Sequence, residues 1–277
     1  FIREQAEPGA TVIVEPSARN TAPAIGLAAA ILPADAIMLV CPSDHHISDP
    51  AAFTDAARIA ARLARDDWMV AFGIKADRPE TGYGYIRSGE SVDGGYTIER
   101  FVEKPDLETA QGFLADGGYA WNGGIFAFRA GAYLAELSAH RPAMAEAVRA
   151  AVASARRDGD LVYPSAKPFD AIAGESVDYA VMEQSRRAAV VPVSMGWSDI
   201  GNWQALRDAL PADANGTRVR GRVDLAECRN VLVDTDGPRV SVVGLEDVII
   251  VVDGDEILVT SATGAQLVGK LPGASQQ

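Results

Sequence analysis

The stretch Asp35-Ala-Ile-Met-Leu-Val-Cys-Pro-Ser-Asp44-His45-His46 decides the fold. Its uninterrupted apolar run, Ala36 to Cys41, is typical of a strand buried on both faces of a parallel sheet. Pro42 removes a backbone donor and ends the pairing, so Asp44 follows the carboxyl end of this strand. Ligands of open α/β sheets bind outside the carboxyl ends of the strands, which predicts a ligand-facing carboxylate at Asp44. A second helix cap or a loop salt bridge is the alternative interpretation of Asp44.

Alternating strand and helix patterns surround this stretch and predict an α/β domain. Thr11–Val14 is a short strand, Thr21 caps an alanine-rich helix, Asp49 caps a second helix, and Trp68–Ile74 is the third strand. The order βαβαβ requires right-handed crossovers. We therefore expect a mostly parallel sheet with helices on both faces.

The composition changes after Asn215-Gly216, and this change predicts a domain boundary. Short segments rich in valine and isoleucine alternate with glycine and aspartate, and helix-forming patterns end. We predict an α/β domain over residues 1–212 and a small β domain, interpreted as a short β-helix, over residues 213–277. The flat ends of such a domain favour self-association, so we expect a homodimer through it.

Composition and charge exclude several classes of protein. The chain has 277 residues, is 48% hydrophobic, and carries a net charge of −13 without a basic patch, which argues against nucleic-acid binding. The longest apolar run, Ala24 to Leu32, is about half of a membrane span, so we expect no membrane association. Two cysteines, Cys41 in the buried strand and Cys228, form neither a disulfide framework nor a zinc motif. This usage predicts a cytoplasmic protein.

Polar residues gather where predicted strands end. They are Glu15 and Asn20, Asp44, Glu103 with Lys104, and Asp199. Two carboxylates that converge would repel by about 4 kcal/mol at ~4 Å. A divalent cation removes this repulsion, and hard oxygen ligands with open positions suit Mg²⁺ that carries phosphate. We expect the carboxylates of Asp44 and Asp199 to converge.

Seven ordered motifs point to one family. They are Glu15-Pro-x-x-Arg19-Asn-Thr-Ala-Pro-Ala24, Pro42-Ser-Asp-His45, Pro79-Glu-Thr-Gly-Tyr-Gly-Tyr-Ile86, Phe101-Val-Glu-Lys-Pro105, Trp121-Asn-x-Gly-x-Phe126, Ser176-Val-Asp-Tyr-Ala-Val-Met-Glu183 and Gly196-Trp-Ser-Asp-Ile-Gly-x-Trp203. Together they resemble the bacterial mannose-1-phosphate guanylyltransferases, which are sugar nucleotidyltransferases, from Glu15 to about Leu210. The resemblance implies a Rossmann-like nucleotide-diphospho-sugar transferase fold.

The resemblance also implies a division of labour at the catalytic centre. Asp44 and Asp199 would be the Mg²⁺ ligands. Lys104 would hold the sugar phosphate, which agrees with the use of lysine as a point charge for phosphate. Glu103 would accept hydrogen bonds from sugar hydroxyls. A surface ion pair is the alternative interpretation of Glu103 and Lys104.

Five further residues would bind the two substrates. Asn122 and the backbone of Gly84 would hold the hexose, and Glu15, Asn20 and Thr21 would lie near the nucleotide. The alternative interpretation of Asn122 is a residue that forms a turn. The implied partners are GTP and mannose 1-phosphate.

The implied reaction needs no general base. The phosphate of mannose 1-phosphate is mostly dianionic at pH 7 and attacks the α-phosphorus of GTP directly, so catalysis rests on positioning and charge neutralisation. His45 and His46 would then orient the loop rather than transfer protons. Two alternatives stay open: transfer to another hexose 1-phosphate, and a non-catalytic protein that binds sugar phosphate.

The chain departs from the family pattern in two respects. It opens on Phe1, as if within a helix, and the glycine-rich phosphate loop of the family would precede that residue. We expect the first βα segment to be missing. It also ends without the isomerase domain of some relatives, which predicts a single activity.

Overall fold

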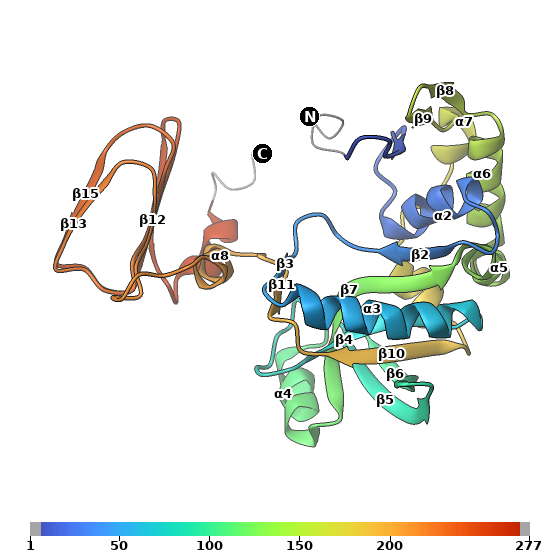
Figure 1. Cartoon of the computed structure of the whole chain (residues 1–277), viewed down its shortest axis with the longest axis horizontal. Coiled ribbons are helices and arrows are strands. Elements are labelled where there is room, and N and C mark those ends of the chain that lie inside the picture. The colour runs from blue at the N-terminus through green and yellow to red at the C-terminus, as the bar shows by residue number, and fades with distance from the viewer. Residues whose placement is uncertain (1–6, 272–277) are drawn as a thin grey trace. The chain divides into compact units, whose positions relative to one another are not determined.

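The computed structural model describes residues 7–271 and divides into two compact units. The first comprises Phe1–Pro42 and Asp49–Met195, and the second comprises Ser43–Ser48 and Gly196–Gln277 (Figure 1). The helix expected at Phe1 lies outside the described residues. This division falls earlier than the boundary predicted at residues 212/213, because residues that follow Met195 pair with the segment Ser43–Ser48.

The first unit contains short strands, one π-helical turn and helices in alternation. In chain order they are β1 (Val12–Ile13), α2 (Thr21–Ile31), β2 (Ile37–Val40), α3 (Pro50–Arg65), β4 (Met69–Lys75), β5 (Tyr85–Val92), β6 (Gly95–Val102), α4 (Leu107–Asp116), β7 (Tyr119–Arg129), α5 (Ala130–His140), α6 (Pro142–Ala153), β8 (Arg156–Asp158), β9 (Leu161–Tyr163), α7 (Ala166–Phe169), the π-helical turn η1 (Asp178–Met182) and β10 (Ala188–Val193).

The main sheet has the order β2-β7-β4-β10-β6-β5, and β7 also pairs with β5, so the sheet curls back on itself. The predicted α/β fold is confirmed, but its strand directions differ from the mostly parallel arrangement. Strands β4 and β10 are parallel neighbours, whereas β7 and the hairpin β5–β6 pair in antiparallel fashion. Strand β1 pairs with β9 in a separate sheet, β1-β9-β8.

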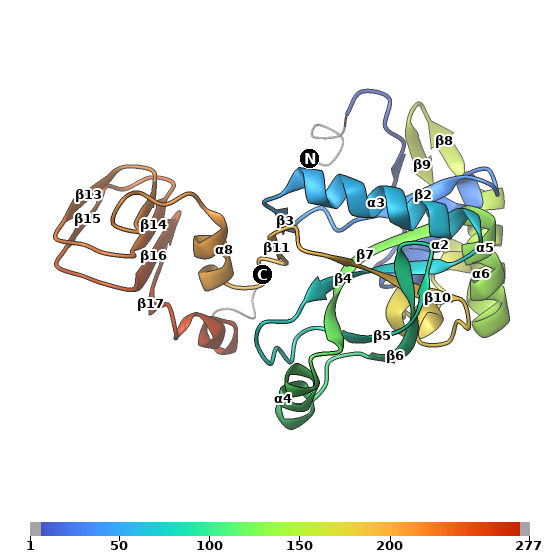
Figure 2. The same ribbon diagram turned by 60° about the horizontal axis from the view of Figure 1, so that its bottom comes forward.

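Helices cover both faces of the main sheet, as predicted (Figure 2). Alternate residues of β4 point to opposite sides, as in any strand. Met69 and Ala71 join the core that includes residues of α2, α5, α6 and η1. On the other face Phe72 packs against Phe53 of α3, with ring centroids 6.0 Å apart.

The opening stretch differs from its prediction in burial. Strand β2 lies at one end of the main sheet, and Leu39 is 44% exposed, so β2 is not buried on both faces. Cys41 follows the strand and is exposed. The apolar run could not reveal this, because the position of a strand within its sheet depends on distant segments. The cap prediction for α3 is confirmed: Asp49 Oδ1 accepts hydrogen bonds from the N–H groups of Ala51 and Ala52.

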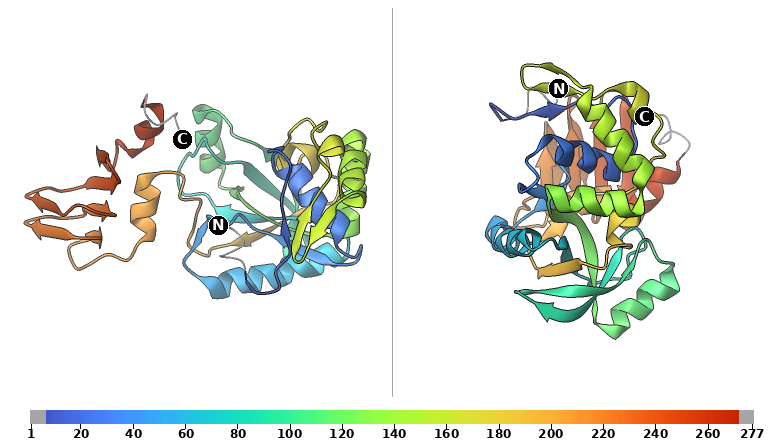
Figure 3. Two further views of the ribbon diagram at one scale, coloured as in Figure 1. Left: turned by 90° about the horizontal axis from the view of Figure 1, so that it is seen from above. Right: turned by 90° about the vertical axis from the view of Figure 1, so that its right-hand side faces the viewer.

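The second unit is built from stacked strands. Its elements are β3 (His46–Ile47), β11 (Trp197–Ser198), α8 (Trp203–Ala209), β12 (Arg218–Arg220), β13 (Val223–Ala226), β14 (Leu232–Thr235), β15 (Val240–Val243), β16 (Val248–Asp253), β17 (Glu256–Ser261) and the 3₁₀ turn η2 (Ala265–Lys270). Parallel ladders join β12 to β14, β14 to β16, and β13 to β15, which is the pattern of a short parallel coil (Figure 3). Strand β17 adds to β16 in antiparallel fashion.

Apolar side chains fill the inside of this coil. Val231, Val233, Val242 and Ile250 form one buried cluster between the two layers of strands. On the outer side of β14 and β16, a second cluster packs near α8 and η2. Within residues 7–271, no helix is both long and apolar enough to cross a membrane.

Candidate active site

The register of the main sheet places three candidate site residues side by side. Trp121 of β7 pairs with Tyr85 of β5, and Tyr85 pairs with Val102 of β6. Asn122, Gly84 and Glu103 each lie next to one member of this row. The N–H group of Asn122 donates to the carbonyl oxygen of Gly84 over 2.8 Å. These residues therefore meet through strand register, although β6 does not run parallel to β4.

Glu103 is the most perturbed carboxyl group of this cluster. Its side chain is 11% exposed, and its Oε2 atom is buried without a hydrogen-bond partner among the described residues. Burial, and then the charge of Asp178, raise the pKa of Glu103 to about 7, while Lys104 lowers it. A buried oxygen that lacks a protein donor is costly, so this atom is available to accept a hydrogen bond from a ligand.

The absence of a side chain at Gly84 leaves room for the carboxyl group of Glu103. A Cβ atom at residue 84 would collide with Oε2 of Glu103 and stand 3.2 Å from Cβ of Asn122. A glycine at this position lets the backbone approach both side chains closely. Residue 84 therefore needs to be glycine for a steric reason, while the contact of its backbone with a hexose stays a prediction.

Asn122 is oriented by a second carboxylate. Its Nδ2 atom donates to Oδ1 of Asp178 over 2.7 Å, and its Oδ1 atom accepts from the N–H group of Gly124 over 3.2 Å. Asp178 begins the turn η1, and burial raises its pKa. Burial also raises the pKa of Glu183. The cluster thus contains the carboxyl groups of Glu103, Asp178 and Glu183.

Lys104 supplies positive charge next to these acids. Its Nζ atom lies 3.8 Å from Oε1 of Glu103, and its side chain is 64% exposed. Its φ angle of 47° is in the left-handed region, which costs a non-glycine residue of order 1 kcal/mol or more. Strain of this kind is tolerated where the surrounding structure holds the residue, and such residues gather at functional sites.

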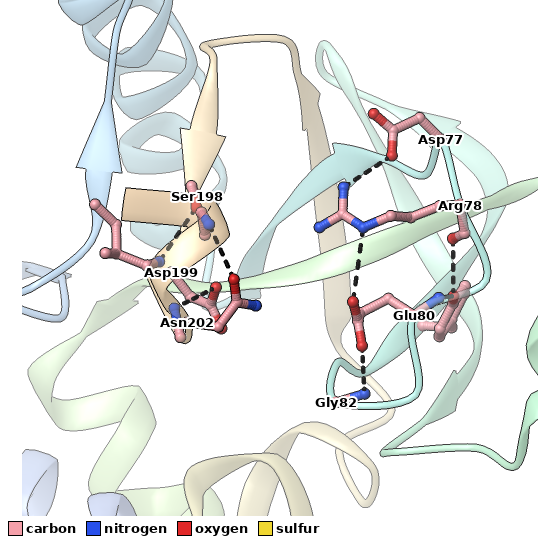
Figure 4. A network of polar contacts seen from close by, with 11 residues as sticks. Asp77, Arg78, Glu80, Gly82, Ser198, Asp199 and Asn202 are labelled. Carbon is pink, nitrogen blue, oxygen red and sulfur yellow. Dashed lines mark hydrogen bonds and ion pairs between the residues drawn. The ribbon is translucent and has the colours of Figure 1, made fainter. Parts of the chain in front are cut away.

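The loop before Gly84 is held by contacts of Arg78 and Glu80, whose ion pair and hydrogen bond to Gly82 are drawn in Figure 4. The guanidinium group of Arg78 lies 4.9 Å from the centroid of the Trp121 ring, and its Nε atom is 3.6 Å from Oε2 of Glu80. Oε1 of Glu80 accepts from the N–H group of Gly82. These contacts fix the conformation of the turn that leads to Gly84, Glu103 and Asn122.

Of the candidate nucleotide residues, Asn20 and Thr21 form the start of α2, and Glu15 is in the loop that precedes it. Asn20 is the N-cap, since its Oδ1 atom accepts from the N–H group of Thr21 over 2.8 Å, so the prediction that Thr21 caps the helix is wrong. The hydroxyl of Thr21 instead accepts from the N–H group of Val177 over 2.9 Å. Burial raises the pKa of Glu15. Their contact with a nucleotide stays a prediction.

The second unit contains both candidate metal ligands. Strands β3 and β11 pair through His46 and Ser198, and Asp44 and Asp199 flank this short ribbon. Burial lowers the pKa of His45, and the charges of Asp44 and Asp199 act in the opposite direction. The ribbon thus brings two acids that are far apart in sequence to the same histidine.

The profile of the family described as Nucleotidyl transferase matches residues 2–216. The chain belongs to the nucleotidyl transferase family. The alginate biosynthesis protein AlgA of Pseudomonas aeruginosa is 44% identical over 90% of this chain and 53% of its own length. The mannose-1-phosphate guanylyltransferase of Escherichia coli K12 is 42% identical over 94% of this chain and 56% of its own length. The chain thus spans about half the length of the curated relatives it matches.

Solved structures are similar to this nucleotidyl transferase over most of the chain. The structure titled mannose-1-phosphate geranyltransferase, from Thermus thermophilus, has a TM-score of 0.80 and 32% identity, covering 93% of this chain and 75% of the other. A second structure, titled mannose-6-phosphate isomerase from Helicobacter pylori, has a TM-score of 0.65 and 33% identity over 71% of this chain and 77% of its own.

The candidate metal ligands of this nucleotidyl transferase suit a hard divalent cation whose remaining coordination positions are filled by substrate. Within residues 7–271, no cluster of three or more His, Cys, Asp or Glu side chains could enclose a metal ion. Mg²⁺ commonly takes one or two carboxylates, phosphate oxygens and water rather than a cage of protein ligands. The carboxylates of Asp44 and Asp199 fit that habit, and their role as ligands stays a prediction.

Sequence reasoning missed Asp178 and Glu183 as members of the cluster. Both belong to the motif Ser176–Glu183, to which no role was assigned. The sequence contained one signal that could have identified them, which is the presence of two acidic residues in a short motif that also has an apolar face. Their approach to Glu103 depends on how η1 packs against the sheet, which local sequence does not determine.

Proposed function

We propose that this chain transfers GMP from GTP to mannose 1-phosphate, which gives GDP-mannose and pyrophosphate. The observation that carries the proposal is the buried Oε2 atom of Glu103 without a protein partner among the described residues, next to the exposed ammonium group of Lys104. An acceptor beside a cation matches a ligand that has both hydroxyl groups and a phosphate. Membership of the nucleotidyl transferase family and relatives named mannose-1-phosphate guanylyltransferase support it.

Each residue of the first unit has a proposed task. Glu103 and Asn122 bind the sugar hydroxyls, and Gly84 keeps the backbone close to the ring. Asp178 holds the amide of Asn122 in one orientation, because its carboxylate can only accept the Nδ2 hydrogen bond. Lys104 binds the sugar phosphate.

The reaction is an in-line displacement at phosphorus. A phosphate oxygen of mannose 1-phosphate forms a bond to the α-phosphorus of GTP, and the bond to the pyrophosphate oxygen breaks. No proton needs to be removed, since the attacking phosphate is mostly dianionic at pH 7. Asp44 and Asp199 hold Mg²⁺, which when bound neutralises phosphate charge. The protein contributes mainly orientation and charge.

Three further assignments belong to the same proposal. Glu15, Asn20 and Thr21 lie near the bound GTP. The β domain self-associates, so the protein is a homodimer. The protein works in the cytoplasm, which agrees with free Cys41 and Cys228.

The test is a pyrophosphate-release assay with the full chain, GTP and Mg²⁺, and a panel of hexose 1-phosphates. We expect release with mannose 1-phosphate and GTP, and much less with ATP or with glucose 1-phosphate. A higher kcat/KM for another hexose 1-phosphate would replace mannose as the substrate. Calorimetric binding of mannose 1-phosphate without pyrophosphate release would favour a non-catalytic sugar-phosphate-binding protein.

A further inference from the structure

His45 and Trp197 form a side-chain contact to which the proposed reaction assigns no task. The indole Nε1 of Trp197 donates to Nδ1 of His45 over 3.1 Å, and the two rings meet edge to face with centroids 5.3 Å apart. Because an indole N–H group only donates, Nδ1 of His45 is the acceptor and carries no proton. The hydrogen bond thus selects one neutral tautomer and one orientation of the imidazole.

This side-chain contact links the two strands of a very short β ribbon. Strands β3 and β11 are each two residues long and pair only through Trp197 with Ile47 and Ser198 with His46. The N–H group of Ser48 donates to the carbonyl oxygen of Gly196 at the far end. Two-stranded ribbons of this length are marginal by themselves. A side-chain link therefore has a large influence on how the two strands are held.

The link lies at the acidic end of the ribbon. His45 stands between Asp44 and His46 in sequence, and Trp197 is two residues before Asp199. The Trp197–His45 hydrogen bond therefore joins the two chain segments next to their acids.

The loop beyond Asp199 has its own local bonds (Figure 4). Oδ1 of Asp199 accepts from the N–H group of Gly201, and Oγ of Ser198 accepts from the N–H group of Ile200, both over 3.2 Å. These bonds shape the Asp199 turn within one chain segment, just after β11. They do not relate it to Asp44, which precedes β3 on the other chain segment.

We propose that His45 and Trp197 are positioning residues that hold Asp44 and Asp199 at the separation a divalent cation requires. If Trp197 and His45 only packed against each other, any rings of similar size could replace them. The proposal instead requires the indole N–H donor and the imidazole acceptor. It rests on the proposed function only for the role of the two acids as cation ligands.

The test measures binding of Mn²⁺ alone to the full chain, read from the electron paramagnetic resonance signal of free Mn²⁺. His45→Leu removes the acceptor and Trp197→Phe removes the donor, and we expect about tenfold weaker Mn²⁺ binding for each, as for other residues that orient metal ligands. His45→Asn supplies a new acceptor near the position of Nδ1, and we expect it to restore binding. His140→Leu and Trp68→Phe, both in the first unit, are the matched controls and should bind Mn²⁺ as the parent does.

A second experiment measures how the rate of pyrophosphate release depends on the Mg²⁺ concentration. The two disruptive variants should need about tenfold more Mg²⁺ for half-maximal rate, while kcat at saturating Mg²⁺ changes little. Unchanged Mn²⁺ affinity in folded His45→Leu and Trp197→Phe would overturn the proposal, as would failure of His45→Asn to restore binding. Absence of Mn²⁺ binding by the parent would overturn it too. Mn²⁺ binding that depends on this pair, in a chain that releases no pyrophosphate, would reject the proposed function alone.

Discussion

The buried carboxyl group of Glu103 can accept a hydrogen bond from a ligand, but its burial destabilises the fold. Its carboxyl group is buried near Asp178 and Glu183, and one of its oxygens lacks a donor among the described residues. Burial and neighbouring negative charge both favour the protonated form. The positive charge of Lys104 favours the ionised form of Glu103 instead. Its ammonium group is exposed to solvent, however, and water screens this interaction. A ligand that donates hydrogen bonds to Glu103 would relieve this cost.

The first prediction concerns the effect of pH on Glu103. Its folded-state pKa is raised from 4.5 to about 7, so its contribution to stability is present below pH 4.5 and is lost as the pH rises to about 7. The loss amounts to roughly 3 kcal/mol, because each pKa unit is about 1.4 kcal/mol. Glu103→Gln removes the charge and should therefore be more stable than the parent at pH 8. This advantage should shrink at pH 5.

Thermal unfolding followed by circular dichroism at the two pH values measures this effect. Glu90→Gln, at an exposed position of β5, is the control and should change little. A Glu103→Gln variant that is less stable than the parent at pH 8 would show that the ionised carboxylate has a stabilising partner in the fold.

The second prediction concerns Lys104. Lys104→Met should weaken the use of mannose 1-phosphate far more than the binding of GTP, because the lost hydrogen bond is to a charged phosphate. Such a bond is worth about 1.5–3 kcal/mol, which is roughly ten- to a hundred-fold in kcat/KM. Steady-state kinetics with each substrate varied in turn measures the difference, with Lys167→Met on α7 as control. Equal losses for both substrates would assign Lys104 to the triphosphate or to stability.

The third prediction concerns the space at Gly84. Gly84→Ala should abolish measurable mannose 1-phosphate binding in isothermal titration calorimetry while the chain still folds, since the new methyl group displaces Glu103 and crowds Asn122. Gly112→Ala is the matched control, because nothing lies within 4 Å of the corresponding Cβ position. Normal binding by Gly84→Ala would mean that Glu103 moves without consequence for the sugar.

At the scale of elements, the start of α2 holds the turn that presents Asp178. The hydroxyl of Thr21 accepts from Val177, and the N–H group of Ala22 donates to the carbonyl oxygen of Glu175. Two 2.6 Å hydrogen bonds join the guanidinium group of Arg141 to the carboxylate of Glu175. The helix that carries candidate nucleotide residues is therefore coupled to the turn that carries Asp178, the hydrogen-bond partner of Asn122.

The fourth prediction tests this coupling. Thr21→Val leaves the Val177 N–H group without its acceptor, which should lower the free energy of unfolding by about 1–3 kcal/mol. Because Asp178 follows Val177, the KM for mannose 1-phosphate should rise as well. Urea denaturation and substrate kinetics measure the two effects, and Thr21→Ser should restore both. A KM that stays constant in a destabilised Thr21→Val would show that η1 keeps its position by packing alone.

At the scale of the whole molecule, the β domain leaves an apolar strand surface exposed. Ile257 and Val259 of β17 are 70% and 63% exposed, and they pair with Val252 and Ile250, which are buried inside the coil. The interior surface of the coil thus continues onto β17 without cover from the described residues. Exposed apolar strands of this kind are prone to pair with other chains.

The fifth prediction is that the chain forms a homodimer through this surface. The double variant Ile257→Lys and Val259→Lys should shift the chain from dimer to monomer in sedimentation-velocity experiments. Leu107→Lys, at an exposed apolar position of α4, is the control and should not change the mass. A parent chain that sediments as a monomer would contradict the predicted dimer.

The sequence by itself determined the features that depend on neighbouring residues. Asp49 caps α3 as expected, Asp106 caps α4 in the same way, and Gly117 ends α4 in the left-handed conformation. Cap and turn preferences act over three or four residues, so they can be read locally. The ordered motifs likewise identified the family and singled out Glu103 before its surroundings were known.

Only the tertiary structure decided what depends on distant segments. The antiparallel course of β7 and its second pairing with β5 bring Asn122 and Gly84 to Glu103, and no local pattern encodes that register. The exposure of Leu39 and the approach of Asp178 follow from where each element packs. Burial and strand pairing are sums over contacts between residues far apart in sequence, whereas propensity and capping are properties of a single turn or strand.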